Sequence, residues 1–276
     1  MRRRLAAAGK SNFLMFGEAF DGNDELVGSF TFDNEMDSVF YFPQKYRVYD
    51  DVFMRSGPTS KVEELLQLRA TNYGDTPAEG GVGIPPQQAL VNFIDNHDVP
   101  RFLFETKNRE ALRTALAYLF TQDGIPCVYY GTEQDYEGGN DPSNREPLWW
   151  SGYRTDGETF RWIRQLIDLR KQNPALRRGE TTLRWTTNSV ADEQDAGILA
   201  FERAVDDSYA LVVINTSDEA TSETSSSQTE GGADMAVGAA PGTTLTDAVG
   251  GQSFTVAADG TLVVELPPRG VAILQP

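Results

Sequence analysis

Carboxyl-bearing side chains follow three apolar runs of this sequence directly. Glu18 ends FLMFGE, Asp98 ends ALVNFIDNHD, and Glu133 ends CVYYGTE. A pair of such carboxyl groups is what glycoside hydrolysis needs: one protonates the leaving oxygen, and others stabilise the oxocarbenium-like positive charge. An acid in this role needs a raised pKa, which Phe16 and Phe20 could supply to Glu18 by excluding water. The pattern alone makes Glu18 a candidate for the acid and leaves the second carboxyl group open among the acids that follow the other strands.

Each of these residues also has a purely structural interpretation. An acid after a strand is often a helix N-cap, and a lone histidine such as His97 is commonly a satisfied structural residue. Asn96 is more simply a loop former than a ligand-binding group. Asp141 and Arg145 would serve equally as an ion pair that braces their loop.

The apolar runs themselves predict the elements that carry these residues. The predicted strands cover 13–18, 37–43, 89–98 and 127–133. The predicted helices cover 59–70, 108–122 and 158–172. Strands that alternate with helices are typical of βα units and a parallel sheet, whose carboxyl ends meet at one edge. We therefore expect Glu18 and Asp98 at the ends of neighbouring strands.

The pattern changes after Pro174, where helical periodicity gives way to short strands separated by Gly, Asp and Pro turns. Runs such as GILAFERA, SYALVVINTS and GVAILQP predict an all-β antiparallel sandwich. The sequence thus predicts an α/β domain over 1–176 and a β-sandwich domain over 177–276. The aromatic residues Trp149, Trp150 and Tyr153, in the loop before the predicted helix at 158–172, are expected in the core, with stacking on sugar rings as the alternative.

Composition excludes several classes of function. The formal charge is −17, with 41 Asp and Glu against 24 Lys and Arg. Such an acidic chain disfavours binding to nucleic acid or to an anionic membrane surface. A single cysteine, Cys127, and a single histidine, His97, exclude an internal disulfide and a zinc site of several histidines. The first ten residues, MRRRLAAAGK, lack the apolar stretch of a signal peptide and predict the end of an amphipathic helix.

At these motifs the sequence resembles the alpha-amylase family of glycoside hydrolases over nearly its whole length. FLMFGEAFDG resembles the motif of the family's fifth strand, which implies that Glu18 is the proton donor. VNFIDNHDVPRF resembles the seventh-strand motif, which implies that Asp98 stabilises the transition state and that His97 binds the sugar, with Asn96 beside them. In the loop GGNDPSNRE, the resemblance places further sugar contacts on Asp141 and Arg145.

The resemblance implies a fold of strands five to eight of a (β/α)8 TIM barrel followed by a β-sandwich. It implies retaining hydrolysis of α-1,4-glucans such as starch. The family's nucleophilic Asp and first-strand motif have no counterpart here, since residues 1–17 contain no Asp, Glu or His. We therefore expect a truncated or mis-started chain that begins inside the fourth helix. Its function is then either that of an incomplete hydrolase, a non-catalytic glucan-binding remnant, or one half of a two-chain enzyme.

Cofactor, partner and location follow from the same resemblance. No ligand set for a metal is visible in the sequence, and Ca²⁺ is implied only for the complete enzyme. The expected partner is an α-glucan, and the open edges of a half barrel favour self-association or complementation by another chain. An extracellular or periplasmic location is expected for the complete enzyme, although this chain shows no signal peptide.

Overall fold

Four short parallel strands form the centre of the α/β part in the computed structural model, which describes residues 1–10, 12–191 and 193–276. They are β1 (Phe16–Gly17), β2 (Ser38–Val39), β3 (Val91–Phe93) and β4 (Ile125–Cys127). β1 pairs with β2, a parallel bridge from Phe40 to Val91 joins β2 to β3, and β3 pairs with β4. Their spatial order therefore follows the chain. Because β2 lies between β1 and β3, the expectation that Glu18 and Asp98 end neighbouring strands is wrong: one strand separates them.

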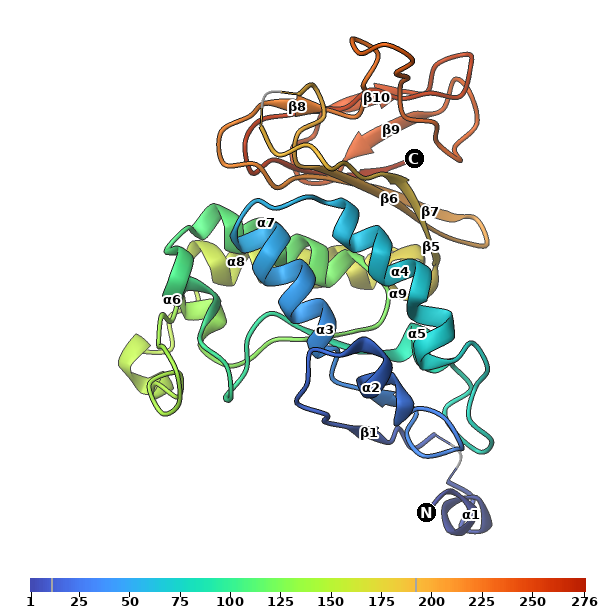
Figure 1. The fold of residues 1–276 in the computed structure, drawn as a ribbon, viewed down its shortest axis with the longest axis vertical. Coiled ribbons are helices and arrows are strands. Elements are labelled where there is room, and N and C mark those ends of the chain that lie inside the picture. Colours follow the sequence, from blue (N-terminus) through green and yellow to red (C-terminus); the bar gives the residue numbers. More distant parts are fainter. Residues whose placement is uncertain (11, 192) are drawn as a thin grey trace.

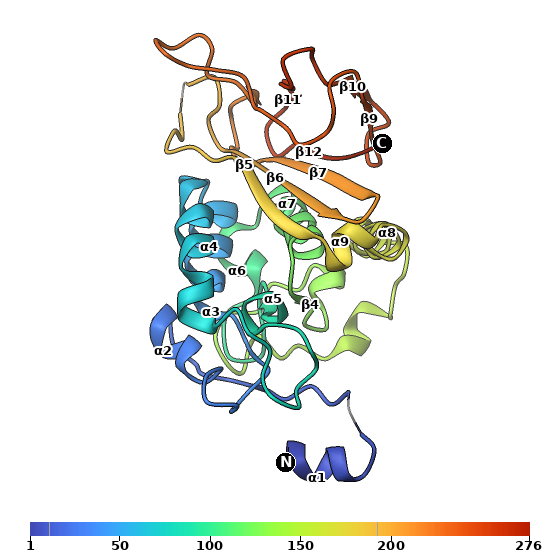
Figure 2. The ribbon, with the colours of Figure 1, turned by 90° about the vertical axis from the view of Figure 1, so that its right-hand side faces the viewer.

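Most of the helices lie between these strands and the β-rich part (Figures 1 and 2). In chain order the helices are α1 (Arg2–Ala7), α2 (Asp24–Ser29), α3 (Phe42–Gln44), the π-helix η1 (Lys45–Met54), α4 (Ser60–Tyr73), α5 (Pro86–Ala89), α6 (Phe102–Thr106), α7 (Arg109–Thr121), the 3₁₀-helices η2 (Thr132–Gln134) and η3 (Leu148–Ser151), α8 (Glu158–Gln172) and α9 (Pro174–Arg178). The three helices predicted from periodicity are confirmed as α4, α7 and α8. The helix expected at the amino terminus is α1, and none of its residues is buried.

All four observed strands are shorter than predicted, and the predicted ranges 37–43 and 127–133 also contain other elements. The run 37–43 forms strand only at its first residues, because Pro43 lies in the first turn of α3 and the chain continues into η1. The strand predicted at 127–133 is β4, which ends at Cys127. The residues after it turn outward through Gly131, whose φ is +89°, and enter η2. The residues after this turn, which include Asp141 and Arg145, are therefore not part of the strand.

The β-rich part contains an antiparallel six-stranded sheet in the order β10-β9-β12-β7-β6-β5, and β8 pairs separately with β11. These strands are β5 (Glu180–Trp185), β6 (Ile198–Val205), β7 (Ser208–Asn215), β8 (Ser222–Glu223), β9 (Thr244–Asp247), β10 (Ser253–Thr255), β11 (Glu265–Leu266) and β12 (Val271–Gln275). The predicted all-β sandwich is confirmed. The boundary predicted between 176 and 177 falls inside α9 and stays a prediction.

Both faces of the central strands of this sheet, β6, β7 and β12, are buried, which explains why these strands read as continuous apolar runs. On β6, Leu199 and Phe201 pack on the helices of the α/β part, whereas Ile198 and Ala200 pack on the outer layer of the sandwich. The same alternation occurs along β7 and β12, as a strand requires. The sheet therefore joins the two parts through one shared core.

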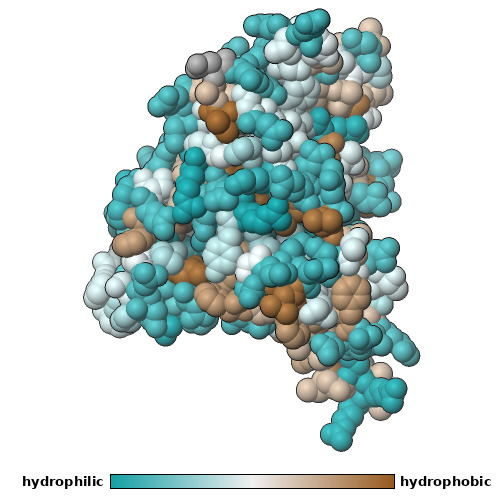
Figure 3. Space-filling view, viewed as in Figure 1, coloured by the Kyte–Doolittle hydropathy of each residue, from teal (hydrophilic) through white to brown (hydrophobic). Residues whose placement is uncertain are grey.

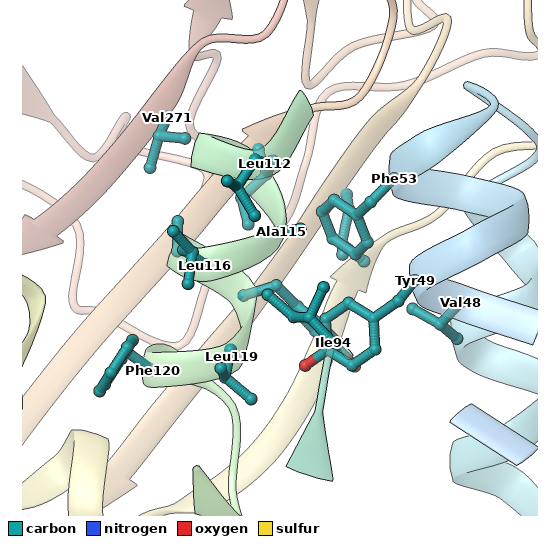
Figure 4. Packing of buried hydrophobic residues seen from close by; sticks show 14 of the residues in the cluster. Val48, Tyr49, Phe53, Ile94, Leu112, Ala115, Leu116, Leu119, Phe120 and Val271 are labelled. Carbon is teal, nitrogen blue, oxygen red and sulfur yellow. The ribbon is translucent and has the colours of Figure 1, made fainter. Parts of the chain in front are cut away.

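Helix α7 lies at the middle of that core (Figure 4). Its residues Leu112, Leu116 and Leu119 pack between Phe53 of η1 on one side and Val271 of β12 on the other. Full burial of a side chain of this size contributes about 1.5–3 kcal/mol. The predicted inward stripe of this helix is thus part of the core that the α/β part shares with the β-rich part.

Buried arginines close the end of α7. Arg170 donates hydrogen bonds to the carbonyls of Phe120 and Gln122, and Arg203 donates one to the carbonyl of Thr121. These carbonyls have no partner within the helix, so the guanidinium groups satisfy them. Burial lowers the pKa of Arg170 to about 10 and lowers that of Arg203 as well. This arrangement fixes the point from which the chain enters β4.

Candidate functional site

The end of β3 is held by two buried polar side chains. Asp95 accepts hydrogen bonds from the backbone N–H of Phe102 and from the hydroxyl of Thr132, at 3.1 and 2.8 Å. Burial raises the pKa of Asp95, although Arg101 and these hydrogen bonds act against that shift. Asp95 therefore ties the loop after β3 to η2, which follows β4.

Asn96 shapes the next turn of this loop. Its side-chain oxygen accepts from the N–H of Asp98 at 2.8 Å and from that of Val99 at 3.1 Å. Because its side-chain oxygen accepts these two backbone hydrogen bonds, the geometry of Asn96 fits the loop-forming interpretation given for it above. The turn leaves His97 and Asp98 exposed while the residues on both sides are buried.

Four of the six predicted site residues meet at this exposed turn. His97 Nε2 lies 3.3 Å from Asp98 Oδ2, and Arg145 Nη2 lies 3.5 Å from Asp98 Oδ1. Arg145 Nε also lies 3.0 Å from Asp141 Oδ1 and donates to the carbonyl of His97 at 3.2 Å. The side chains of His97 and Asp98 are 52% and 35% exposed. Because exposed ion pairs contribute little to stability, their polar atoms remain free to exchange water for a ligand.

A buried asparagine, Asn144, bonds the backbone that carries His97 and Asp98. The side-chain amide of Asn144 donates to the carbonyls of His97 and Val99, at 2.9 and 2.8 Å. Asn144 is fully buried and lies beside Arg145 in the chain. It joins the loop that carries Asp141 and Arg145 to the end of β3.

Arg101 forms a second buried support. Its guanidinium carbon lies 4.0 Å from the ring centroid of Tyr129, and its Nε lies 3.2 Å from Glu146 Oε2. The other carboxylate oxygen of Glu146 accepts from the N–H of Gly138 at 2.6 Å. Burial, followed by interaction with Tyr130, raises the pKa of Tyr129 to about 12. The structure thus places Arg101 as a brace between the loop after β3 and the loop that carries Glu146.

Glu18 lies apart from that cluster, directly after β1, and is exposed. No hydrogen bond or ion pair among the described residues involves its carboxylate. The nearby rings do not bury it, because Phe16 packs edge-on against Phe40 at 5.3 Å and Phe20 against Phe42 at 4.9 Å. The burial of Glu18 that we expected from Phe16 and Phe20 is therefore not found within the part of the chain that the structure describes.

An aromatic row sets the position of β1 relative to β3. Phe16, Phe40 and Phe93 follow one another edge to face, with centroids 5.3 and 5.5 Å apart. Glu18 follows the first of these rings by two residues, and Asp98 follows the last by five. The two predicted catalytic carboxyl groups thus extend from the carboxyl ends of strands that share one packed layer.

Comparison with known proteins decides the family. Residues 1–157 match the model of the alpha amylase catalytic domain, and residues 189–276 match that of the alpha amylase C-terminal all-beta domain. The chain belongs to the alpha-amylase family. Its catalytic part is a partial alpha-amylase catalytic domain, followed by the family's all-β domain.

Several relatives illustrate the match. A cyclomaltodextrin glucanotransferase from Bacillus sp. (strain 1011) is 38% identical over 90% of this chain and 33% of its own length. An alpha-amylase from Niallia circulans is 33% identical over 73% of this chain and 37% of its own. The crystal structure of an Anoxybacillus alpha-amylase matches with a TM-score of 0.76 at 23% identity, over 99% of this chain and 54% of that one. The chain thus spans about a third of the length of these curated relatives.

Two further properties concern metal binding and membrane insertion. Among the described residues, no group of three or more His, Cys, Asp or Glu side chains is arranged to hold a metal ion. No helix within 1–10, 12–191 and 193–276 has both the length and the apolar character for a membrane span.

Sequence reasoning missed the buried supports of this site. Asp95 and Asn144 contact residues 37 and 45 positions away, respectively, so no local pattern marks them. The only signal was the density of polar residues after each strand. For Trp149, Trp150 and Tyr153 the expected core position is wrong, because all three side chains are exposed.

Proposed function

We propose that this chain carries the acid half of a retaining α-glucan hydrolase of the alpha-amylase type. Glu18 is the proton donor, Asp98 stabilises the positive charge of the transition state, and His97 binds the sugar beside the scissile bond. Asp141 and Arg145 bind a neighbouring sugar. The observation that carries this proposal is the exposed cluster of Asp98, His97, Asp141 and Arg145 at the strand ends.

The proposed reaction divides into two displacements. In the first, Glu18 gives its proton to the glycosidic oxygen as the bond from that oxygen to the anomeric carbon breaks, and a carboxylate on the opposite face of the sugar bonds to that carbon. In the second, the ionised Glu18 takes a proton from water, and the water oxygen replaces the carboxylate. Asp98 carries negative charge close to the reacting sugar in both steps.

The nucleophilic carboxylate has no counterpart among residues 1–17, which contain no Asp, Glu or His. We infer that it is supplied by residues outside this sequence, on strands that complete the barrel. Two arrangements would provide them: a longer chain, or a second polypeptide that pairs with the open strand edges. The second is supported by β4, where Ile125 and Val128 are exposed although each lies at a strand or its end.

The relatives favour glucan transfer as a second candidate reaction. Six relatives, including those from Bacillus sp. (strain 1011) and Paenibacillus macerans, carry the name cyclomaltodextrin glucanotransferase. Transfer and hydrolysis share the first displacement and differ in whether water or a sugar hydroxyl completes the second. An α-glucan in an extracellular or periplasmic compartment would be the substrate of either.

The test compares the 276-residue chain with the same chain complemented by the missing barrel strands. We expect no release of reducing sugar from soluble starch by the chain alone, and release after complementation. Glu18→Gln should abolish that release, whereas Glu25→Gln, at an exposed acid of α2, should not. Chromatography of the products separates linear maltooligosaccharides from transfer products.

Three outcomes would count against the proposal. Strong hydrolysis by the chain alone that Glu18→Gln removes would show that the nucleophile lies within these residues. Complemented activity that survives Glu18→Gln would remove Glu18 as proton donor. Maltooligosaccharide binding by calorimetry without any complemented activity would favour the non-catalytic glucan-binding remnant instead.

A further inference from the structure

Three aromatic side chains stand out on the loop that follows the candidate sugar contacts. Trp149, Trp150 and Tyr153 are 66%, 70% and 63% exposed, more than any other aromatic residue that the structure describes. They lie in η3 and just after it, on the yellow-green segment that projects at the lower left of Figure 1. Clustered exposed aromatic surface of this kind marks an interaction site rather than packing.

The backbone beneath these rings is fixed at both ends. The hydroxyl of Tyr136 donates to the carbonyls of Pro147 and Leu148, at 2.9 and 3.1 Å, just where η3 begins. The side-chain amide of Gln134 donates to the carbonyl of Arg154 at 3.0 Å, just after the last ring. The rings are therefore exposed on an anchored segment, which limits the conformational freedom that a ligand would have to remove.

Tyr153 adds a strained conformation. Its φ is +55°, in the left-handed region that bulky residues rarely adopt, and its N–H donates to the hydroxyl of Ser151 at 3.1 Å. Such conformations persist where the surrounding structure enforces them and cluster at ligand-binding sites. Here the constraint supports an aromatic ring that packs against little of the protein.

We propose that Trp149, Trp150 and Tyr153 form a stacking platform for an α-glucan chain. The identity of this ligand rests on the function proposed above. Trp149 follows Arg145 by four residues, so roughly 14 Å of extended chain at most separates the platform from the candidate sugar contacts. One oligosaccharide can then contact both, and the platform favours long glucan chains over short ones.

The chemistry of the platform fits a neutral polyol better than other occupants. The flat C–H face of a glucose ring covers an aromatic face while its hydroxyl groups stay in water, and Trp and Tyr supply large contact area with few rotatable bonds. Polyanions are disfavoured by the chain's charge of −17. An apolar protein segment is less suited, because Ser151, Gly152 and Arg154 interrupt the aromatic surface.

Tryptophan fluorescence reports on the platform directly. The chain has four tryptophans, of which Trp162 is buried and Trp185 is half-buried and bonded to Asp195. Acrylamide should therefore quench mainly Trp149 and Trp150. We expect saturating maltoheptaose to lower the quenching constant of the 276-residue chain by about half, and to have little effect on the Trp149→Ala/Trp150→Ala variant.

Affinity gives the second readout. Truncating a stacked aromatic residue typically weakens binding by roughly tenfold, so the double variant should bind maltoheptaose at least about tenfold more weakly in calorimetry, and Tyr153→Ala should weaken it as well. Phe30→Ala removes another exposed ring, at the end of α2, and should leave the affinity unchanged. Unchanged quenching with maltoheptaose, or equal affinity of the double variant and Phe30→Ala, would overturn the platform.

The Glu18→Gln variant separates this proposal from the proposed function. Protection of the tryptophans by maltoheptaose should persist in Glu18→Gln, since that side chain lies outside the platform. If complemented activity proves independent of Glu18 while protection persists, the proposed mechanism fails and the platform stands. If acrylamide no longer reaches Trp149 and Trp150 once the barrel strands are supplied, protein covers them and the platform is refuted.

Discussion

Asn144→Ala tests whether the candidate site depends on a buried support. The side-chain amide of Asn144 is the only group in its loop that bonds the carbonyls of both His97 and Val99, at 2.9 and 2.8 Å, within the described part of the chain. Removing it disconnects the loop that carries Asp141 and Arg145 from the end of β3. The exposed ion pairs among these residues are too weak to replace it.

The expected cost follows from the contacts. Two hydrogen bonds contribute roughly 1 kcal/mol each, and the buried Val99 carbonyl, which loses its described partner while that of His97 keeps Arg145, adds about 1–3 kcal/mol. The side-chain oxygen of Asn144 is buried without a described hydrogen-bond partner, so its removal offsets part of that loss. We expect a net loss of about 2 kcal/mol, which corresponds to a fall of about 4–8 °C in Tm for a chain of this size.

Thermal unfolding and maltoheptaose calorimetry together measure the effect. The Tm should fall as stated, and the affinity should weaken by about tenfold because Arg145 is no longer held against the turn at His97. Asn140→Ala is the matched control, since Asn140 lies in the same loop and is exposed. If Asn144→Ala and Asn140→Ala had the same Tm and the same affinity, the reasoning that Asn144 positions the site would be refuted.

Two further predictions concern stability. Arg203→Met should lower the free energy of unfolding by about 3 kcal/mol or more, because Arg203 donates hydrogen bonds to the last turn of α7 and to the carbonyl of Gly179 inside the core. Chemical denaturation measures this, with Arg178→Met, at an exposed position, as the control. Equal denaturation midpoints for the two variants would contradict the prediction. Hydrogen bonding from Arg269 lowers the pKa of Asp218, so the carboxylate stabilises the fold above the pKa of about 3.9 in the unfolded chain and loses this effect as pH falls through its folded value. The Tm difference between the native chain and Asp218→Asn should therefore be constant above about pH 5 and shrink below pH 4; a difference that does not change with pH would contradict this.

The elements that could be predicted from sequence are those whose pattern is set by one dominant core. Helix α7 matched its predicted range closely because its apolar stripe faces a core on both sides, and Asn108 caps its first turn. The π-helix η1 was missed, although its buried residues Lys45, Val48, Tyr49, Val52 and Phe53 follow the i, i+3, i+4, i+7, i+8 spacing of an ordinary helix. The strand predicted at 127–133 was displaced because Gly131 and η2 turn those residues toward the site. Local preference was there overridden by tertiary contacts.

For the site, the sequence predicted the residues that meet but not what holds them together. His97, Asp98, Asp141 and Arg145 do lie within contact of one another. Their supports could not be predicted, because they are single side chains bonded across long stretches of chain. The wrong expectation for the tryptophans has the opposite cause: aromatic residues are usually buried, and only the folded loop shows that nothing covers these two.

The polar residues of the candidate site fall into a buried group and an exposed group, which differ in what they bond. Asp95, Asn96 and Asn144 are buried, and their side chains bond the backbone or a hydroxyl, so a ligand has nothing to gain from them. His97 and Asp98 lie between these anchors and bond mainly to each other and to Arg145, through contacts that water competes with. A sugar hydroxyl that enters replaces water at groups already held in place, so little ordering entropy is lost on binding. If the proposed function holds, the rigidity resides in buried residues whose polar atoms are already bonded, and substitutions there should change the affinity for the sugar through the positions of His97, Asp98 and Arg145.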